Sequence, residues 1–304
     1  MSQNVTARGA HLGMLVWAML VGLSFPVVGL MSELPPLLLT ALRFTIACAG
    51  LYLLARRSAN FLPQGRSLPL YALMGACLAG FFAAMFWAAH HATALSMATL
   101  YVTVPLLAFL LGRGLRVEAP GWRLPAILAL GALGALGLAV AEGWQQGGEL
   151  RFGLGEAVFF AGCLSSALYP VLSRWGLARE HLPESAAVRT FWSLGLGGVL
   201  VGALGLATEP LEHLANMTAL DLALLVYLGL CSSALTFWLM QRATAALTPG
   251  VVTAYGYLVP FVSMLLLFMR SPPQIGWVWL PGSLMVLLAM ALLMRHERPS
   301  PRLG

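Results

Sequence analysis

Apolar runs of about 20 residues recur along nearly the whole chain, and they constrain its fold more than any motif. A helix needs roughly 20 residues to cross a bilayer core of about 30 Å. Backbone polar groups in lipid must be satisfied within the segment, so runs of this length indicate helices. The sequence therefore predicts an all-α membrane protein with ten transmembrane helices, at 11–31, 34–55, 68–89, 93–112, 123–141, 153–174, 186–207, 219–240, 248–269 and 275–294.

The composition excludes a soluble protein. Of 304 residues, 60% are hydrophobic and only 9% are charged, whereas soluble domains carry roughly 25% charged residues. Secreted, nucleic-acid-binding and disordered proteins are excluded on the same ground, so the lipid bilayer is an expected partner and nucleic acid is not. The first run has no Ala-x-Ala site after it, and we expect a retained helix rather than a cleaved signal.

The basic residues predict the orientation in the membrane. All 17 are Arg, and most fall in connections that share a side with the N-terminus. Arg151 and Arg270 fall on the opposite side, and Arg43 lies within the second run. Positive residues mark the cytoplasmic side, so both termini are expected there, in a bacterial inner membrane. The Arg-rich, Lys-free composition suggests a bacterial source.

The cysteines and histidines give no sign of a metal site or cofactor. The four cysteines lie singly inside apolar runs, without a CxxC pair, and read as buried thiols. Neighbouring helical residues such as His90 and His91 point about 100° apart and do not chelate together easily. We expect a polar outer turn there, no metal and no cofactor. A Walker motif is also missing from the sequence, which argues against an ATP-driven pump.

The two halves of the chain share a pattern. Phe25-Pro26-Val27-Val28 resembles Tyr169-Pro170-Val171-Leu172, and Thr93 and Thr248 each precede a mid-helix proline, Pro105 or Pro260, by twelve residues. Five helices per half is an odd number, so the second half would enter the membrane upside down. Secondary transporters build a midplane site from such inverted repeats with broken helices. Chance similarity between Ala/Leu-rich helices is the alternative. We expect repeat units at 11–141 and 153–295.

These residues resemble the EamA type of the drug/metabolite transporter superfamily, over about 11–295. The second half carries the resemblance through Leu228-Gly229-Leu230, Phe237-Trp238, the Ala245–Gly250 stretch and Leu258-Val259-Pro260-Phe261. The first half agrees through Trp17, Gly22, Pro35-Pro36, Arg43-Phe44 and the Ala89–Pro105 stretch. The resemblance implies an inner-membrane carrier whose central cavity is lined mainly by helices 1, 3, 4, 6, 8 and 9. Known activities of the family include export of amino acids and other small metabolites.

The chain departs from that family in two places. The family usually has Gly-Glu after helices 4 and 9, where this chain has Gly112-Arg113 and Met269-Arg270. These departures leave the expected fold intact. They make it unsafe to transfer a particular substrate from better-known members.

Two charged residues inside the runs are candidates for transport chemistry. Arg43 lies about nine residues into helix 2, where an Arg costs roughly 2.5–3.5 kcal/mol unless it faces protein or water. It could bind a substrate carboxylate, or it could be a structural Arg bonded to carbonyls. Glu156 is a carboxylate within the predicted span 153–174 and could couple proton entry to export. It also lies in the first turn of helix 6, where the helix dipole favours a negative charge.

Prolines and aromatic residues supply the other candidates. Each mid-helix proline removes a backbone donor and frees a carbonyl one turn earlier, which predicts hinges at Pro26, Pro105, Pro170 and Pro260. A cavity with aromatic walls and few charges suits amphipathic or zwitterionic solutes. The candidate substrate-binding residues are Trp17, Arg43, Tyr101, Tyr169, Trp238, Tyr255 and Tyr257.

The predicted function is a secondary carrier that exports a small-molecule substrate by alternating access. An intramembrane enzyme is an alternative, but Ser165 and Ser166 lack a GxSxG context. A passive channel is a third. A proton is the candidate coupling ion, and the sequence leaves uniport, the solute, the direction and the choice between monomer and homodimer open.

Overall fold

The computed structural model describes residues 6–31, 34–58, 60–145, 150, 153–270 and 277–296, without the side chains of 142–145, 264 and 267–270. These residues form helices and no strand. The first half contains α1 Ala7–Val28, α2 Pro36–Ala55, α3 Ser67–Ala88, α4 Ala94–Tyr101, α5 Val104–Gly114 and α6 Arg123–Gln145. The second contains α7 Leu154–Ala178, α8 Ala186–Thr208, η1 Leu211–Asn216, α9 Ala219–Tyr227, η2 Leu228–Leu235, α10 Thr236–Ala243, α11 Pro249–Ala254, η3 Tyr255–Tyr257, α12 Leu258–Arg270 and α13 Trp279–His296.

The prediction of an all-α membrane protein is confirmed. Within the described ranges, nine helical stretches are long and apolar enough to span a membrane, with α4–α5 and α9–α10 each forming one stretch. The remaining predicted run, 248–269, is built from α11, η3 and α12 and is outside that set. The count of ten therefore stays a prediction. Arg151, Arg298 and Arg302, on which the orientation partly rests, lie outside the described residues.

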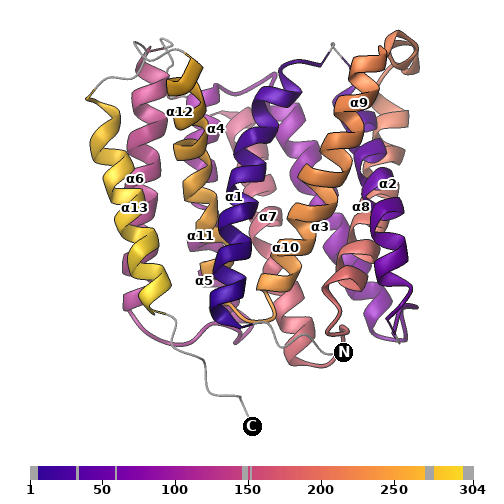
Figure 1. Ribbon diagram of the computed structural model, residues 1–304, viewed down its shortest axis with the longest axis horizontal. Coiled ribbons are helices and arrows are strands. Elements are labelled where there is room, and N and C mark those ends of the chain that lie inside the picture. Colours follow the sequence, from indigo (N-terminus) through magenta and orange to yellow (C-terminus); the bar gives the residue numbers. More distant parts are fainter. Residues whose placement is uncertain are drawn as a thin grey trace.

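The helices form a single bundle (Figure 1). The pair α6 and α13 makes up one end, α2 and α8 pack together at the other, and α1, α3, α5, α7, α10 and α11 lie between them. Helix α1 begins and α13 ends at the lower end of the view. The helices that the resemblance places around a central cavity are thus the inner ones.

Small residues bring two helix pairs close. A Cβ added at Gly75 of α3 would lie 2.7 Å from the backbone nitrogen of Gly197 in α8. A Cβ added at Gly134 of α6 would lie 2.9 Å from the carbonyl oxygen of Gly282 in α13. Small residues allow this approach in membranes, where packing rather than the hydrophobic effect joins helices.

The packing partners of the two halves correspond. Helix α1 packs on α10 and α12, and its counterpart α7 packs on α3 and α5. Helix α2 packs on η2, and its counterpart α8 packs on α3. Each contact recurs when first-half spans are exchanged for second-half spans. This is the pattern that a twofold relation between the halves would produce.

Candidate functional site

Two helices are broken near prolines at which the sequence predicts hinges. Helix 4 consists of α4 and α5, which are separated at Val102 and Thr103, just before Pro105. Helix 9 consists of α11 and α12, which are joined by the 3₁₀ turn η3. Pro260 lies in the first turn of α12, directly after this break. A proline cannot donate the backbone hydrogen bond of the preceding turn, so both breaks have the same local cause. Helices α1 and α7 run on through Pro26 and Pro170, whose hinge role stays a prediction.

The two breaks meet in the interior. A Cβ added at Gly256 of η3 would lie 3.9 Å from Cε1 of Tyr101, the last residue of α4. The Tyr101 ring also lies 6.0 Å from that of Phe81 in α3, and it packs on a cluster that includes Cys163 and Ala167 of α7. Residues from helices 3, 4, 6 and 9 therefore converge on Tyr101.

The predicted residues Trp17, Tyr255 and Tyr257 share one buried cluster. The Tyr255 hydroxyl lies 2.6 Å from Nδ1 of His11 and joins η3 to α1. Tyr257 is 3% exposed, and its hydroxyl has no hydrogen-bond partner among the described residues. A buried hydroxyl without a partner costs about 1–3 kcal/mol, which makes the Tyr257 hydroxyl a candidate contact for a solute.

Tyr169 and Trp238 lie in a second cluster. The buried Tyr169 hydroxyl bonds with Ser193 Oγ at 2.9 Å, and its ring meets Phe237 edge-on at 5.9 Å. Trp238 is half-buried and packs against both this cluster and the one around Tyr255. Tyr101 packs on a third cluster, between α3, α5 and α7. The structure thus distributes the predicted aromatic residues over three adjoining clusters.

Arg43 and Arg189 differ sharply in their surroundings. Arg43 is half-buried in α2, and its Nε atom has no partner among the described residues. Arg189 of α8 is fully buried and donates to the carbonyl oxygens of Pro183, Glu184 and Gln241 and to Gln241 Oε1. Arg189 has the bonding expected of a structural Arg, whereas Arg43 retains a free donor.

Glu156 caps the start of α7. Its Oε2 accepts a hydrogen bond of 2.9 Å from the Gly153 backbone nitrogen, while its buried Oε1 has no partner in the described part of the chain. The neighbouring turn packs on this helix start, since a Cβ added at Gly155 would collide with the His91 carbonyl. The His91 ring stacks on Trp87 and bonds to its carbonyl oxygen. Among the described residues, no group of His, Cys, Asp and Glu could hold a metal.

Sequence reasoning missed three buried polar side chains near the Arg-rich end of the bundle. His11 was placed at the edge of the first run without a role, yet it bonds with Tyr255. Arg189 lies near the start of the predicted span 186–207, where the sequence gives it no separate role. Glu118, in the α5–α6 connection, is 5% exposed and accepts a hydrogen bond from the Gly250 backbone nitrogen. The similarity of Arg189-Thr190-Phe191 to Arg43-Phe44 was a usable signal for Arg189. Nothing in the sequence marked Glu118.

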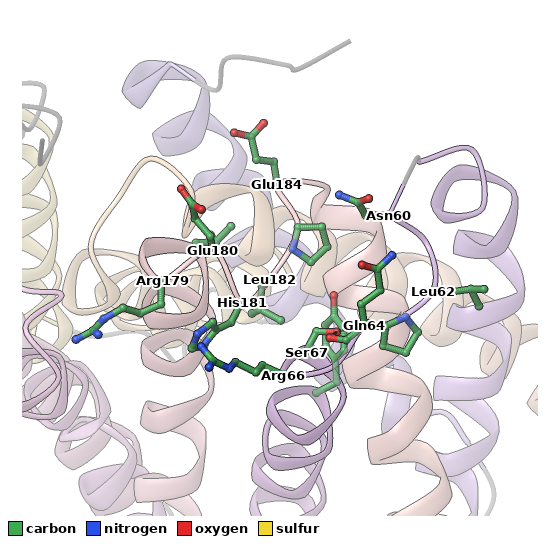
Figure 2. Close-up of a pocket in the computed structure, with 14 residues that line it drawn as sticks. Asn60, Leu62, Gln64, Arg66, Ser67, Arg179, Glu180, His181, Leu182 and Glu184 are labelled. Carbon is green, nitrogen blue, oxygen red and sulfur yellow. Dashed lines mark hydrogen bonds between the residues drawn. The ribbon is translucent and has the colours of Figure 1, made fainter.

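A pocket of about 770 Å³ opens at the same end, between the α2–α3 and α7–α8 connections (Figure 2). In this view Glu180 and Glu184 point outward from the helix ends, and Arg66 extends toward His181. None of the predicted substrate-binding residues lines this pocket. It is a feature of the bundle's surface, apart from the broken helices.

Comparisons with known proteins agree on one class. Residues 153–295 match the EamA-like transporter family. The chain is 28% identical to a probable terminal-alkyne amino-acid exporter of Streptantibioticus cattleyicolor, over 78% of this chain and 77% of that protein. It is 24% identical to Protein PecM of Dickeya dadantii, over 83% and 84% of the two chains. A solved structure superposes with a TM-score of 0.79 at 21% identity, over 94% of this chain and 96% of the other.

Proposed function

Because the chain belongs to the EamA-like transporter family of the drug/metabolite transporter superfamily, we propose that it is a secondary carrier of the bacterial inner membrane. It exports small metabolites, amino acids among them, by alternating access. Its two units, 11–141 and 153–295, are related by inversion and rock against each other around the central helices. Both termini face the cytoplasm.

The contact between Tyr101 and Gly256 carries this proposal. It joins the break of helix 4 to the break of helix 9, so each half contributes one broken helix to the same place. Broken helices expose backbone groups where they line a site rather than lipid, as in carriers built from inverted repeats. Hinges at Pro105 and Pro260 let the segments on either side of the breaks move separately. Pro26 and Pro170 have the same role, at smaller amplitude, in continuous helices.

The predicted site residues favour a zwitterionic solute with an apolar portion. Among the described residues, the buried Tyr257 hydroxyl in η3 has no partner, and neither has the Nε donor of Arg43 in α2, which could bind a carboxylate. Trp17, Tyr255, Tyr101, Tyr169 and Trp238 supply aromatic surface. The relative from Streptantibioticus cattleyicolor is named as an amino-acid exporter, which supports the same solute class.

Glu156 is the proposed proton site on the outer side. One carboxylate oxygen is used in capping α7, and the other is buried without a partner among the described residues. A proton that enters there and moves inward would drive an outward flux of solute.

Counterflow in proteoliposomes tests the proposal. Vesicles preloaded with an unlabelled amino acid should accumulate the same labelled amino acid transiently, with saturation. Screening apolar and aromatic amino acids first follows from the aromatic walls. Non-saturating flux without counterflow would instead identify a channel, and product formation without flux would identify an enzyme.

A further inference from the structure

Glu118 ties the first half of the chain to the broken helix of the second. It lies in the connection between α5 and α6, and its Oε1 accepts a 2.6 Å hydrogen bond from the backbone nitrogen of Gly250, near the start of α11. Five residues after Gly250, just past the end of α11, the chain reaches Tyr255 in the break. A movement of α11 that breaks the hydrogen bond between Glu118 and Gly250 would therefore also shift Tyr255 in the proposed site.

The connection is folded to hold the carboxyl in place. Arg116 adopts a φ of 60°, which turns the chain back so that the backbone nitrogens of Val117 and Glu118 both donate to the Gly112 carbonyl. A Cβ added at Gly112 would lie 2.6 Å from Glu118 Cγ, so a larger residue there would displace the carboxyl. The side chain of Glu118 is consequently packed between the end of α5 and the start of α11.

Charged groups face Glu118 from two helices. Arg113 of α5 donates to the Glu118 carbonyl oxygen at 3.4 Å, and Arg174 of α7 acts on the carboxyl through its charge. Helix α11 presents Thr248 and the Gly250 nitrogen, which carry no charge. Arg174 itself donates to the carbonyl oxygens of Thr244 and Ala245, just before α11. The proton affinity of Glu118 is therefore set by its burial, opposed by these donors and positive charges.

We propose that Glu118 is a proton-binding latch on the cytoplasmic side, which holds the start of α11 closed when protonated and favours its release when ionised. The inference rests on the proposed carrier function, because it assigns Glu118 as the inner proton site of that carrier. Glu156 would receive the proton at the outer end, and Glu118 would release it to the cytoplasm as α11 moves.

The direction follows from the cost of burying a charge. Burial raises the pKa of the Glu118 carboxyl from 4.5 to about 7, although Gly250, Thr248, Arg174 and Arg113 each lower it. The buried arrangement therefore binds the proton more tightly than an open, hydrated one would. Proton binding therefore stabilises the buried arrangement over the open one fully below pH 4.5, and this stabilisation is lost as the pH rises through 7. With these two values, opening at Glu118 should become about tenfold more favourable between pH 6 and pH 8.

Hydrogen–deuterium exchange of residues 248–254 in the purified full-length protein tests the latch without any substrate. After correction for intrinsic rates, wild-type α11 should exchange about tenfold faster at pH 8 than at pH 6. Glu118→Gln keeps an oxygen that can accept from Gly250 but has no proton to lose, so its exchange should change less than about twofold. Glu184→Gln, an exposed carboxylate at the same end, should behave as wild type.

Equal protection of wild-type α11 at the two pH values would overturn the latch, and this comparison decides the matter even if Glu118→Gln does not fold. Persistence of the pH dependence in a folded Glu118→Gln protein would overturn it as well. If exchange depends on pH but the protein shows no counterflow, the carrier function is refuted, and Glu118 keeps only its pH-dependent hold on α11 without the role of an inner proton site.

Discussion

Tyr101 lies against Gly256, which places the broken end of α4 beside the 3₁₀ turn that interrupts helix 9. The two residues are far apart in sequence and belong to different halves of the chain. A Cβ on residue 256 would lie 3.9 Å from Cε1 of Tyr101, an ordinary van der Waals contact. The two halves therefore meet in van der Waals range at these two residues.

Removing the Tyr257 hydroxyl should impair transport without harming the fold. That hydroxyl has no partner among the described residues, so Tyr257→Phe should melt at the wild-type temperature or slightly above it. Loss of one hydrogen bond to the solute, about 0.5–1.5 kcal/mol, should raise KM roughly two- to tenfold. Flux kinetics and a melting curve in detergent measure both.

Tyr255→Phe is the matched comparison. It loses the 2.6 Å bond to His11 and should lower stability by roughly 1 kcal/mol. Unchanged KM in Tyr257→Phe would remove helix 9 from the proposed binding site.

Replacing the prolines at the two breaks should stiffen the carrier. Pro105→Ala and Pro260→Ala restore a backbone donor and a good helix former, so the breaks should shorten. We expect a lower maximal flux, severalfold for each variant, with stability maintained or raised. Pro120→Ala, in the exposed connection before α6, should leave the flux as it is. A maximal flux at the wild-type level in both break variants would argue against hinge motion there.

Arg189 should be needed for folding. Arg189→Ala would leave Gln241 Oε1 and the carbonyl oxygens of Pro183, Glu184 and Gln241 without this donor. We expect a loss of about 2–5 kcal/mol, seen as aggregation or a lower melting temperature. Arg179→Ala, whose exposed guanidinium lies over Trp175, should stay near wild type. Normal melting of Arg189→Ala would show that these bonds are dispensable.

Glu156→Gln separates capping from proton coupling. The amide oxygen can still accept from Gly153, so α7 should keep its start and the protein its stability. If Glu156 carries the proton, flux driven by a pH gradient should fall at least severalfold, while counterflow without a gradient persists. An unaltered response to the pH gradient would leave Glu156 with its capping role alone.

Glu118 should also give the whole protein a pH-dependent stability. Because its pKa in the folded protein, about 7, is above the ordinary 4.5, its contribution favours folding at low pH and declines as the pH rises through 7. Wild type should therefore gain about 1 kcal/mol, relative to Glu118→Gln, when the pH falls from 8 to 6. Unfolding of both proteins across this range measures the difference. Parallel profiles would contradict the burial of Glu118.

Local sequence signals predicted most of the helices. The helix predicted at 186–207 corresponds to α8 Ala186–Thr208, and the helix predicted at 68–89 corresponds to α3 Ser67–Ala88. These ends are marked by polar residues beside long apolar stretches, such as the N-cap Ser185 of α8. Pro105 and Pro260 predicted interruptions in helices 4 and 9, and the structure has breaks directly after Tyr101 and from Tyr255 onward. The π-helical η2 in the eighth span has no comparable marker, and the sequence predicted a regular helix there.

The site was harder to predict because it depends on contacts between distant segments. The sequence could single out Arg43 and Glu156 from their apolar surroundings. It could not reveal that Glu118, in a polar connection, folds back over Gly112 and reaches Gly250. The family resemblance anticipates a carboxylate directly after Gly112, where this chain has Arg113. The structure supplies a carboxylate at this place from six positions beyond Gly112.

The π turn at Leu228–Leu235 makes the two halves unequal partners. Such a turn accommodates one more residue than an α-helical turn does, and α3, the corresponding span of the first half, is α-helical throughout. A solute that travels between the halves consequently encounters a different wall on each side. Duplicating either half to make a symmetric chain would erase that difference, and the two walls would then present the same side chains to the solute.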